Sequence, residues 1–120
     1  MTFEQIIASA HDALVYAEKK TNGALDVYVQ LHGAYIPDEK QRYYHLSGDF
    51  RFLEHQAWDD EKDPASIRNT YEVTSIEQCE DGSFTAYLLG LELSFEASAV
   101  TVENITKKQY FAHGKKLKVF

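Results

Sequence analysis

Apolar side chains recur at steps of three and four residues in the first segment of the chain. A helix would gather them on one face, which consists of Phe3, Ile6, Ile7, Ala10, Ala13, Leu14 and Ala17. Thr2 and Gln5 have the spacing of a capping box, and Asn22-Gly23 is typical of the left-handed residue that ends a helix. The pattern therefore predicts a helix over residues 2–20.

Beyond residue 23 the hydrophobic period changes from helical to two, which indicates β-strands. A first strand is predicted over residues 25–32, where leucine and valine alternate with polar residues. Residues 37–40 begin with proline and predict a turn. A second strand follows over residues 42–55, and Gly48 inside it predicts a bend or bulge. The highly charged segment 59–66 is predicted to be a loop.

The second half of the chain is also predicted to be β-structure. Apolar positions between residues 67 and 76 change parity near Thr74-Ser75, which predicts a bulge. Residues 80–83 have the composition of a hairpin turn. The apolar stretch 84–95 is predicted to be one central strand, with a face made of Tyr87, Leu89, Leu91, Leu93 and Phe95. Residues 100–105 predict a short strand and residues 110–120 a closing hairpin.

One helix followed by strands with mostly short connections predicts an α+β fold, because short turns join antiparallel neighbours. We expect the N-terminal helix to pack on a curved, mostly antiparallel sheet of six or seven strands, in a single domain covering residues 1–120. Whether the sheet closes into a barrel is left open by the pattern. The predicted core consists of Ile6, Ile7, Leu14, Val27, Val29, Phe52, Leu89, Leu91 and Leu93.

The composition is that of a folded, acidic domain. Apolar residues make up 44% of the 120 residues, which excludes a disordered or low-complexity chain. The net charge of -7 argues against direct nucleic-acid binding, because phosphates would repel the protein. Cys79 is the one cysteine, as expected in a reducing compartment. The most apolar run, residues 86–91, is far shorter than a membrane span, so a cytoplasmic protein without membrane contact is expected.

Charge is distributed unevenly along the chain. Residues 69–106 contain no lysine or arginine, and their acids are Glu72, Glu77, Glu80, Asp81, Glu92, Glu96 and Glu103. A second acidic cluster lies at residues 59–63. No acid follows Glu103, and the last 14 residues, 107–120, carry five lysines. Such a field either makes the protein soluble or steers a partner of opposite charge toward it.

No sequence motif identifies a catalytic activity. The chain lacks Gly-rich phosphate loops, paired CxxC motifs, HExxH and the GxSxG elbow, so we expect no enzyme, no cofactor and no bound metal. Glu80 and Asp81 follow Cys79 directly and disfavour a reactive thiolate there. His32, His45 and Asp49 could form an acid–base or metal site if the fold brought them together. Otherwise they are ordinary polar residues on strand faces.

A small acidic domain without catalytic motifs is typical of a binding protein with a basic partner. The leading hypothesis is an immunity protein that neutralises a cognate nuclease toxin by filling its basic groove with carboxylates, as a monomer or weak dimer. The alternatives are a phage- or plasmid-encoded inhibitor of a nucleic-acid defence protein, and a small ligand-binding or enzymatic domain. The predicted partner-binding residues are Tyr43, Trp58, Asp59, Asp60, Glu61, Asp63, Glu80 and Asp81.

Overall fold

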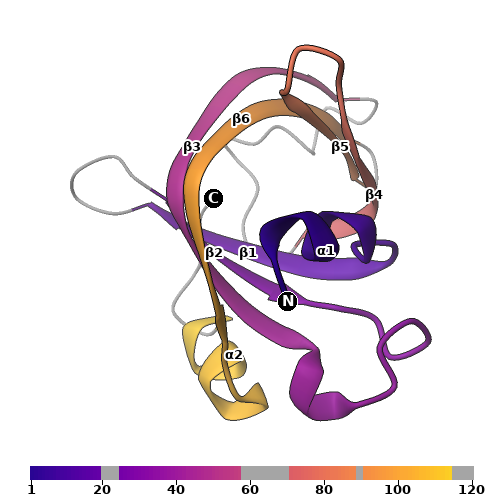
Figure 1. Ribbon diagram of the computed structural model, residues 1–120, viewed down its shortest axis with the longest axis vertical. Helices are drawn as coiled ribbons and strands as arrows, with labels where there is room; N and C mark the ends of the chain where they lie inside the picture. The colour runs from indigo at the N-terminus through magenta and orange to yellow at the C-terminus, as the bar shows by residue number, and fades with distance from the viewer. Residues whose placement is uncertain (20–24, 58–70, 89–90, 115–120) are drawn as a thin grey trace.

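The computed structural model describes residues 1–19, 25–57, 71–88 and 91–114. Its six strands close into a barrel with the spatial order β1-β2-β3-β6-β5-β4 (Figure 1). The strands are β1 (Ala13–Lys19), β2 (Leu25–Gln30), β3 (Tyr43–Ala57), β4 (Tyr71–Gln78), β5 (Phe84–Leu88) and β6 (Leu91–Asn104). The helices are α1 (Phe3–Ala8), the single 3₁₀ turn η1 (Glu39–Gln41) and α2 (Lys107–Gly114).

Every neighbouring pair of strands in the barrel is antiparallel. Strand β4 lies beside β1, so the first four strands have the Greek-key order 4-1-2-3. The last four strands repeat the arrangement, because β3 lies beside β6 and the order is 3-6-5-4. The predicted fold class, a helix on a curved antiparallel sheet, is confirmed. Closure into a barrel adds what the pattern left open.

The predicted N-terminal helix is much too long. Helix α1 starts at the expected capping box of Thr2 and Gln5 but ends at Ala8, and β1 already begins at Ala13. Between them Asp12 has a φ of 60°, a left-handed conformation that no helix can continue through. Leu14, which the helical pattern placed in the core, points outward on β1 and is 36% exposed.

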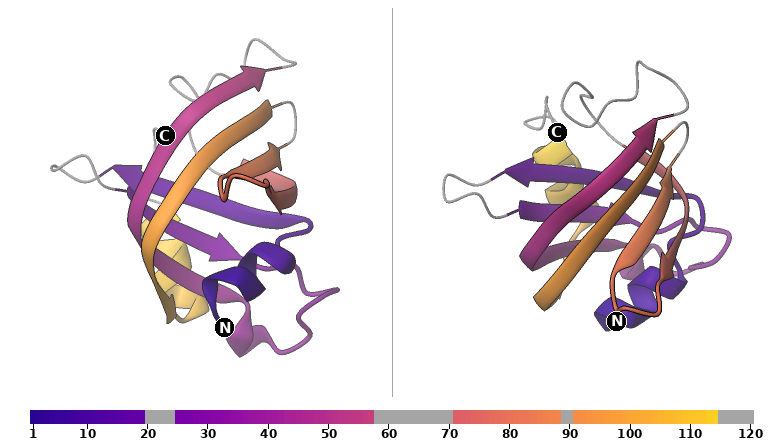
Figure 2. Two further views of the ribbon diagram at one scale, coloured as in Figure 1. Left: turned by 45° about the horizontal axis from the view of Figure 1, so that its top comes forward. Right: turned by 90° about the horizontal axis from the view of Figure 1, so that it is seen from above.

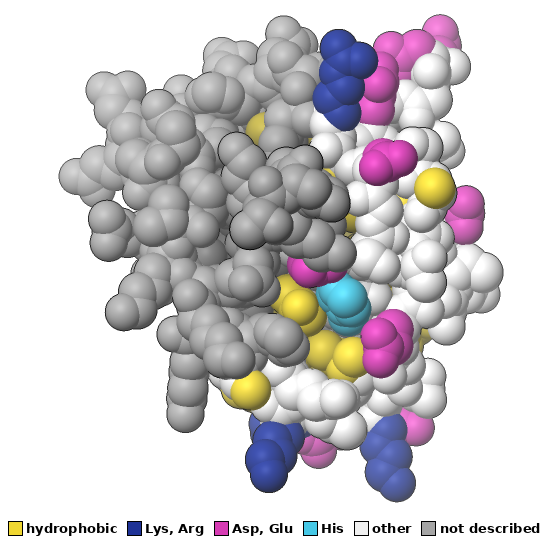
Figure 3. All heavy atoms as spheres, turned by 90° about the vertical axis from the view of Figure 1, so that its left-hand side faces the viewer, with side chains coloured by type: hydrophobic (Ala, Val, Ile, Leu, Met, Phe, Trp, Pro, Cys, Tyr) yellow, Lys and Arg dark blue, Asp and Glu magenta, His cyan; other side chains and the backbone are white. Residues whose placement is uncertain are grey.

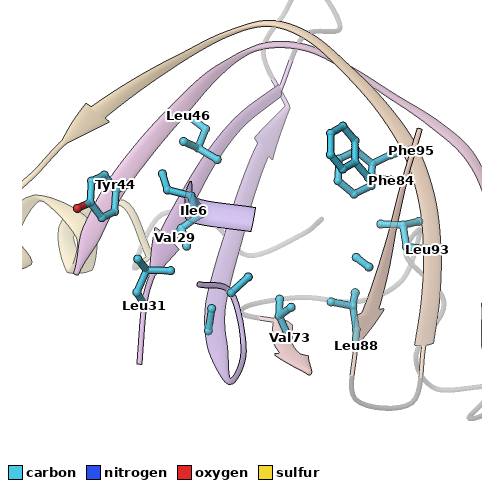
Figure 4. Packing of buried hydrophobic residues seen from close by; sticks show 13 residues of the cluster. Ile6, Val29, Leu31, Tyr44, Leu46, Val73, Phe84, Leu88, Leu93 and Phe95 are labelled. Atoms are coloured by element: carbon cyan, nitrogen blue, oxygen red, sulfur yellow. The ribbon is translucent and has the colours of Figure 1, made fainter. Parts of the chain in front are cut away.

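The core fills the barrel, and α1 lies across one end of it (Figure 2). Ile6 on α1 is 2% exposed and packs among side chains of the barrel wall (Figure 4). Of the predicted core residues, Ile6, Val29 and Leu93 are buried, and Ile7 and Val27 are partly buried against them. Phe52, Leu89 and Leu91 lie outside the part of the chain whose side chains are described.

The long strands bend at bulges where the sequence predicted them. The ladder between β3 and β6 shifts register between Ser47 and Asp49, and the ladder between β4 and β5 shifts between Val73 and Ser75. Gly48 lies at the first shift, where an added Cβ would come within 2.9 Å of the Val100 Cα. The predicted turn at residues 80–83 is also confirmed and joins β4 to β5.

The apolar stretch 84–95 forms two strands instead of the predicted one. β5 and β6 pair with each other across residues 89–90, with Ala86 opposite Leu93 and Phe84 opposite Phe95. The inward face of β5 is therefore Phe84, Ala86 and Leu88, of which Figure 4 labels Phe84 and Leu88. Tyr87 alternates with them and is on the outer face. Continuous hydrophobicity conceals the reversal, because both strands of the hairpin contribute to the core.

The predicted closing hairpin is also wrong, because its first half is helix α2. A capping box starts this helix: the Thr106 N–H donates to the Gln109 side chain, and the Gln109 N–H donates to Thr106 Oγ1. Tyr110 on α2 is completely buried in a second apolar cluster outside the barrel, together with Tyr28, Tyr43 and Ile105. Within the described residues no helix has the length and hydrophobicity to span a bilayer.

Candidate functional site

Antiparallel pairing brings the acids of residues 69–106 onto one side of the barrel. Strands β4, β5 and β6 follow one another in the chain and are also neighbours in space. Their outer surface and the β4–β5 turn carry Glu72, Glu77, Glu80, Asp81, Glu92, Glu96 and Glu103. We call this surface the acidic wall. All of these acids are exposed except Glu92, which is half-buried, and the three strands contain no lysine or arginine.

Tyr87 lies on β5 in the middle of the acidic wall. Glu92 on β6 is directly opposite Tyr87 in the sheet register. The Tyr87 hydroxyl donates to Glu77 Oε2 on β4 at 3.4 Å. The negative charge of Glu77, followed by burial and the charge of Glu92, raises the pKa of the Tyr87 phenol. The wall therefore places an aromatic ring between carboxylates of its two neighbouring strands.

The β4–β5 turn extends the acidic wall at one end. Asp81 Oδ1 accepts hydrogen bonds from the Ser83 hydroxyl at 2.6 Å and from the Ser83 backbone N–H at 2.9 Å. These two hydrogen bonds hold the pKa of Asp81 below its usual value. Glu80 and Asp81, both predicted as partner-binding residues, are thus exposed and belong to the same surface.

Tyr43, another predicted partner-binding residue, is not part of this surface. It is 2% exposed and packs beside Tyr110 and Phe111 of α2. Its strand face turned out to be covered by a helix that the sequence analysis did not predict. The loop residues lie outside the described part of the chain and are Trp58, Asp59, Asp60, Glu61 and Asp63.

His32, His45 and Asp49 do not form the acid–base or metal site considered for them. His32 Nδ1 accepts a hydrogen bond from the Ala34 N–H in the loop after β2. Asp49 lies on β3 beyond the Gly48 bulge, opposite Ser98. No hydrogen bond or ion pair joins these three residues, and the described residues contain no group of three or more His, Cys, Asp or Glu side chains that could hold a metal ion.

His45 instead has acidic neighbours on both adjacent strands. Its Nε2 is 2.9 Å from Asp26 Oδ1 on β2, and its Nδ1 is 3.6 Å from Glu103 Oε2 on β6. The ring also stacks on Tyr28, with centroids 4.8 Å apart. Figure 3 shows this face of the barrel, with a histidine between hydrophobic and acidic side chains.

Sequence reasoning missed the contacts of His45 with Asp26 and Tyr28 and the outward position of Tyr87, although part of the signal was present. Asp26 and Tyr28 lie on the polar parity of the predicted strand 25–32, and antiparallel pairing of this strand with the next one brings His45 beside them. Tyr87 was assigned to the apolar face because residues 84–95 were treated as one strand.

Comparisons with protein-family models, with curated proteins and with solved structures give no match for this chain.

Proposed function

We propose that this chain is a binding protein that docks a basic protein partner on its acidic wall. The observation that carries the proposal is the contiguity of the wall: a run of sequence without lysine or arginine becomes three adjacent strands and their turn. A concentrated field of one sign destabilises a protein through self-repulsion, and it speeds the approach of a partner with the opposite charge. The raised pKa of Tyr87 supports a negative field at the centre of this surface.

The wall has features suited to recognising arginine. Exposed ion pairs contribute only about 0–1 kcal/mol each, so carboxylates alone make a weak interface. An aromatic ring adds buried area, and a guanidinium can stack on the ring while donating hydrogen bonds to carboxylates beside it. Tyr87 has Glu77 and Glu92 on its two sides. A closed barrel also presents these groups without ordering a flexible segment on binding.

Nuclease toxins are the partner class that fits this chemistry best. A nuclease must line its substrate groove with lysine and arginine to bind phosphates. Carboxylates on a rigid sheet can occupy such a groove in place of the phosphates. We therefore propose that the protein acts in the cytoplasm as an immunity protein, without enzymatic activity or cofactor. The same surface would serve a phage- or plasmid-encoded inhibitor of a nucleic-acid defence protein, and the neighbouring genes distinguish the two.

The alternative of a ligand-binding or enzymatic domain receives less support. It required His32, His45 and Asp49 to converge in a pocket, and in the described residues they lie apart. The barrel interior is occupied by a cluster of apolar side chains that includes Val29, Leu46 and Phe84.

The direct test is inhibition of a nuclease domain encoded beside this gene. We expect stoichiometric inhibition by the wild-type protein. The double reversal Glu77→Lys/Glu92→Lys should weaken binding at least about tenfold, because it inverts the field around Tyr87. The matched control, Glu4→Lys/Glu39→Lys, makes the same change in net charge outside β4, β5 and β6. It breaks the exposed ion pair between Glu39 and Lys107, which is worth only about 0–1 kcal/mol, and it should bind within about threefold of wild type.

A third variant separates the wall from the acidic loop. Asp59→Lys/Asp60→Lys/Glu61→Lys reverses the acids at residues 59–63 and leaves the wall intact. Loss of inhibition in this variant alone would place the interface on the loop and contradict our assignment. Equal inhibition by the wild type and the wall reversal would contradict it as well.

A further inference from the structure

The surroundings of His45 form a row across three strands on the outside of the barrel. Tyr28 on β2, His45 on β3 and Glu103 on β6 are direct partners in the sheet register. Asp26 lies two residues before Tyr28 on the same outward face of β2. Among the described residues, the titratable groups on β2 and α2 and at the adjoining ends of β3 and β6, on the same outer face as His45, are Asp26, Tyr28, Tyr43, Glu103, Lys107, Lys108 and Tyr110.

The two contacts of His45 differ in what they require of the ring. Nε2 is at hydrogen-bonding distance from Asp26, whose side chain is 14% exposed, so one N–H is committed to this carboxylate. A neutral ring then turns the lone pair of Nδ1 toward Glu103, which repels the carboxylate. A protonated ring has a second N–H at Nδ1 and attracts the same carboxylate. The His45–Glu103 contact is therefore attractive only with a protonated ring.

Glu103 leads directly into the joint that attaches α2. The next residue, Asn104, donates from its side chain to the Tyr43 carbonyl at 2.9 Å and to the Lys40 carbonyl at 3.0 Å. The Ile105 N–H donates to the Tyr43 carbonyl at 2.9 Å, and Thr106 caps α2. The Glu103 side chain therefore lies next to the hydrogen bonds that attach the start of α2 to β3.

We propose that His45 is a pH-sensitive contact that orders the joint between β6 and α2 when its ring is protonated. Histidine side chains as a class change charge between about pH 5 and pH 8. At the acidic end the Glu103 carboxylate is attracted to the His45 ring, and at the alkaline end it loses this attraction and stays exposed with the other acids of the wall, since 65% of its side chain is exposed already. The proposal does not depend on which partner the wall binds.

Hydrogen exchange of the Ile105 amide tests this device. Ile105 comes directly after β6, and its N–H donates to the Tyr43 carbonyl on β3 beside the His45–Glu103 contact. After correction for intrinsic rates, we expect protection at about pH 5.5 to exceed that at about pH 7.5 at least about threefold. Glu103→Gln should abolish the difference, and so should His45→Gln. Because Glu103 is mostly exposed, its variant should fold even if the His45 variant does not.

His11→Gln is the matched control. His11 also lies near a carboxylate, with Nε2 3.6 Å from Asp12 Oδ2, but at the start of β1 and away from the joint. This variant should retain the wild-type difference in protection. Equal protection of the wild type at the two pH values would overturn the proposal, and so would an undiminished difference in Glu103→Gln.

Discussion

Individual polar residues determine the shape and charge of the β4–β5 turn. Asp81 accepts two hydrogen bonds from Ser83, whose side chain is buried, and the ionised carboxylate is the better acceptor. Gly82 between them has a φ of 87°, which only glycine adopts without strain. The sequence indicated this turn by its composition, since each of its residues acts locally and needs no distant partner.

Asp81 should therefore contribute a pH-dependent stabilisation. Its folded-state pKa is lowered, so the stabilisation is present above the ordinary aspartate pKa of about 3.9 and is lost as the pH falls through the lower folded value. Asp81→Asn should reduce the loss of stability on acidification, as measured by urea unfolding between about pH 5 and pH 2. Glu80→Gln removes a charge from the same turn without these hydrogen bonds and serves as the control. An acid slope in Asp81→Asn identical to that of wild type would contradict this role.

The elements that sequence reasoning misjudged were those with ambiguous local patterns. Ala13, Leu14 and Ala17 fit a helical stripe, and the same segment supplies a strand once Asp12 turns left-handed. α2 was missed because Tyr110 is its one described residue in a buried cluster, so the segment has no helical stripe of apolar residues, and because its capping box was overlooked. Tertiary pairing decides such segments, because propensity differences are small compared with the energy of burial.

The bulge at Gly48 is the element-level device that bends β3 and β6 around the barrel. Gly48→Ala should destabilise the protein by about 1–3 kcal/mol, because the new methyl group meets the backbone of Ser98 and Val100. Ala99, one of the two β6 residues left without a register partner at this shift, has a φ of 52°. Ala99→Gly should stabilise by about 0.5–1 kcal/mol, because relief of left-handed strain exceeds the entropy of glycine. Thermal and urea unfolding measure both changes, and an Ala99→Gly variant less stable than wild type would show that Ala99 is not strained.

At the scale of the whole molecule, the strand order places acids that are spread along residues 69–106 next to one another on a single surface. The sequence analysis recognised that residues 69–106 lack basic residues, but it assigned the interface first to the loop at residues 59–63. Only the meander of β4, β5 and β6 shows that these acids are neighbours and that Tyr87 lies among them. Which face of a strand points outward depends on where each strand begins, and the reversal of chain direction between β5 and β6 was not predicted.

The central claim, that the acidic wall is a docking surface for a cationic protein, is tested most directly by NMR titration with a short all-arginine peptide. The largest amide shifts should fall on β4, β5 and β6 around Tyr87, and they should fade between about 0.1 M and 1 M salt as the Debye length shortens. An all-glutamate peptide should cause none of these shifts, and Glu77→Lys/Glu92→Lys should lose them. Shifts centred on residues 59–63, or no localised shifts at all, would contradict the account.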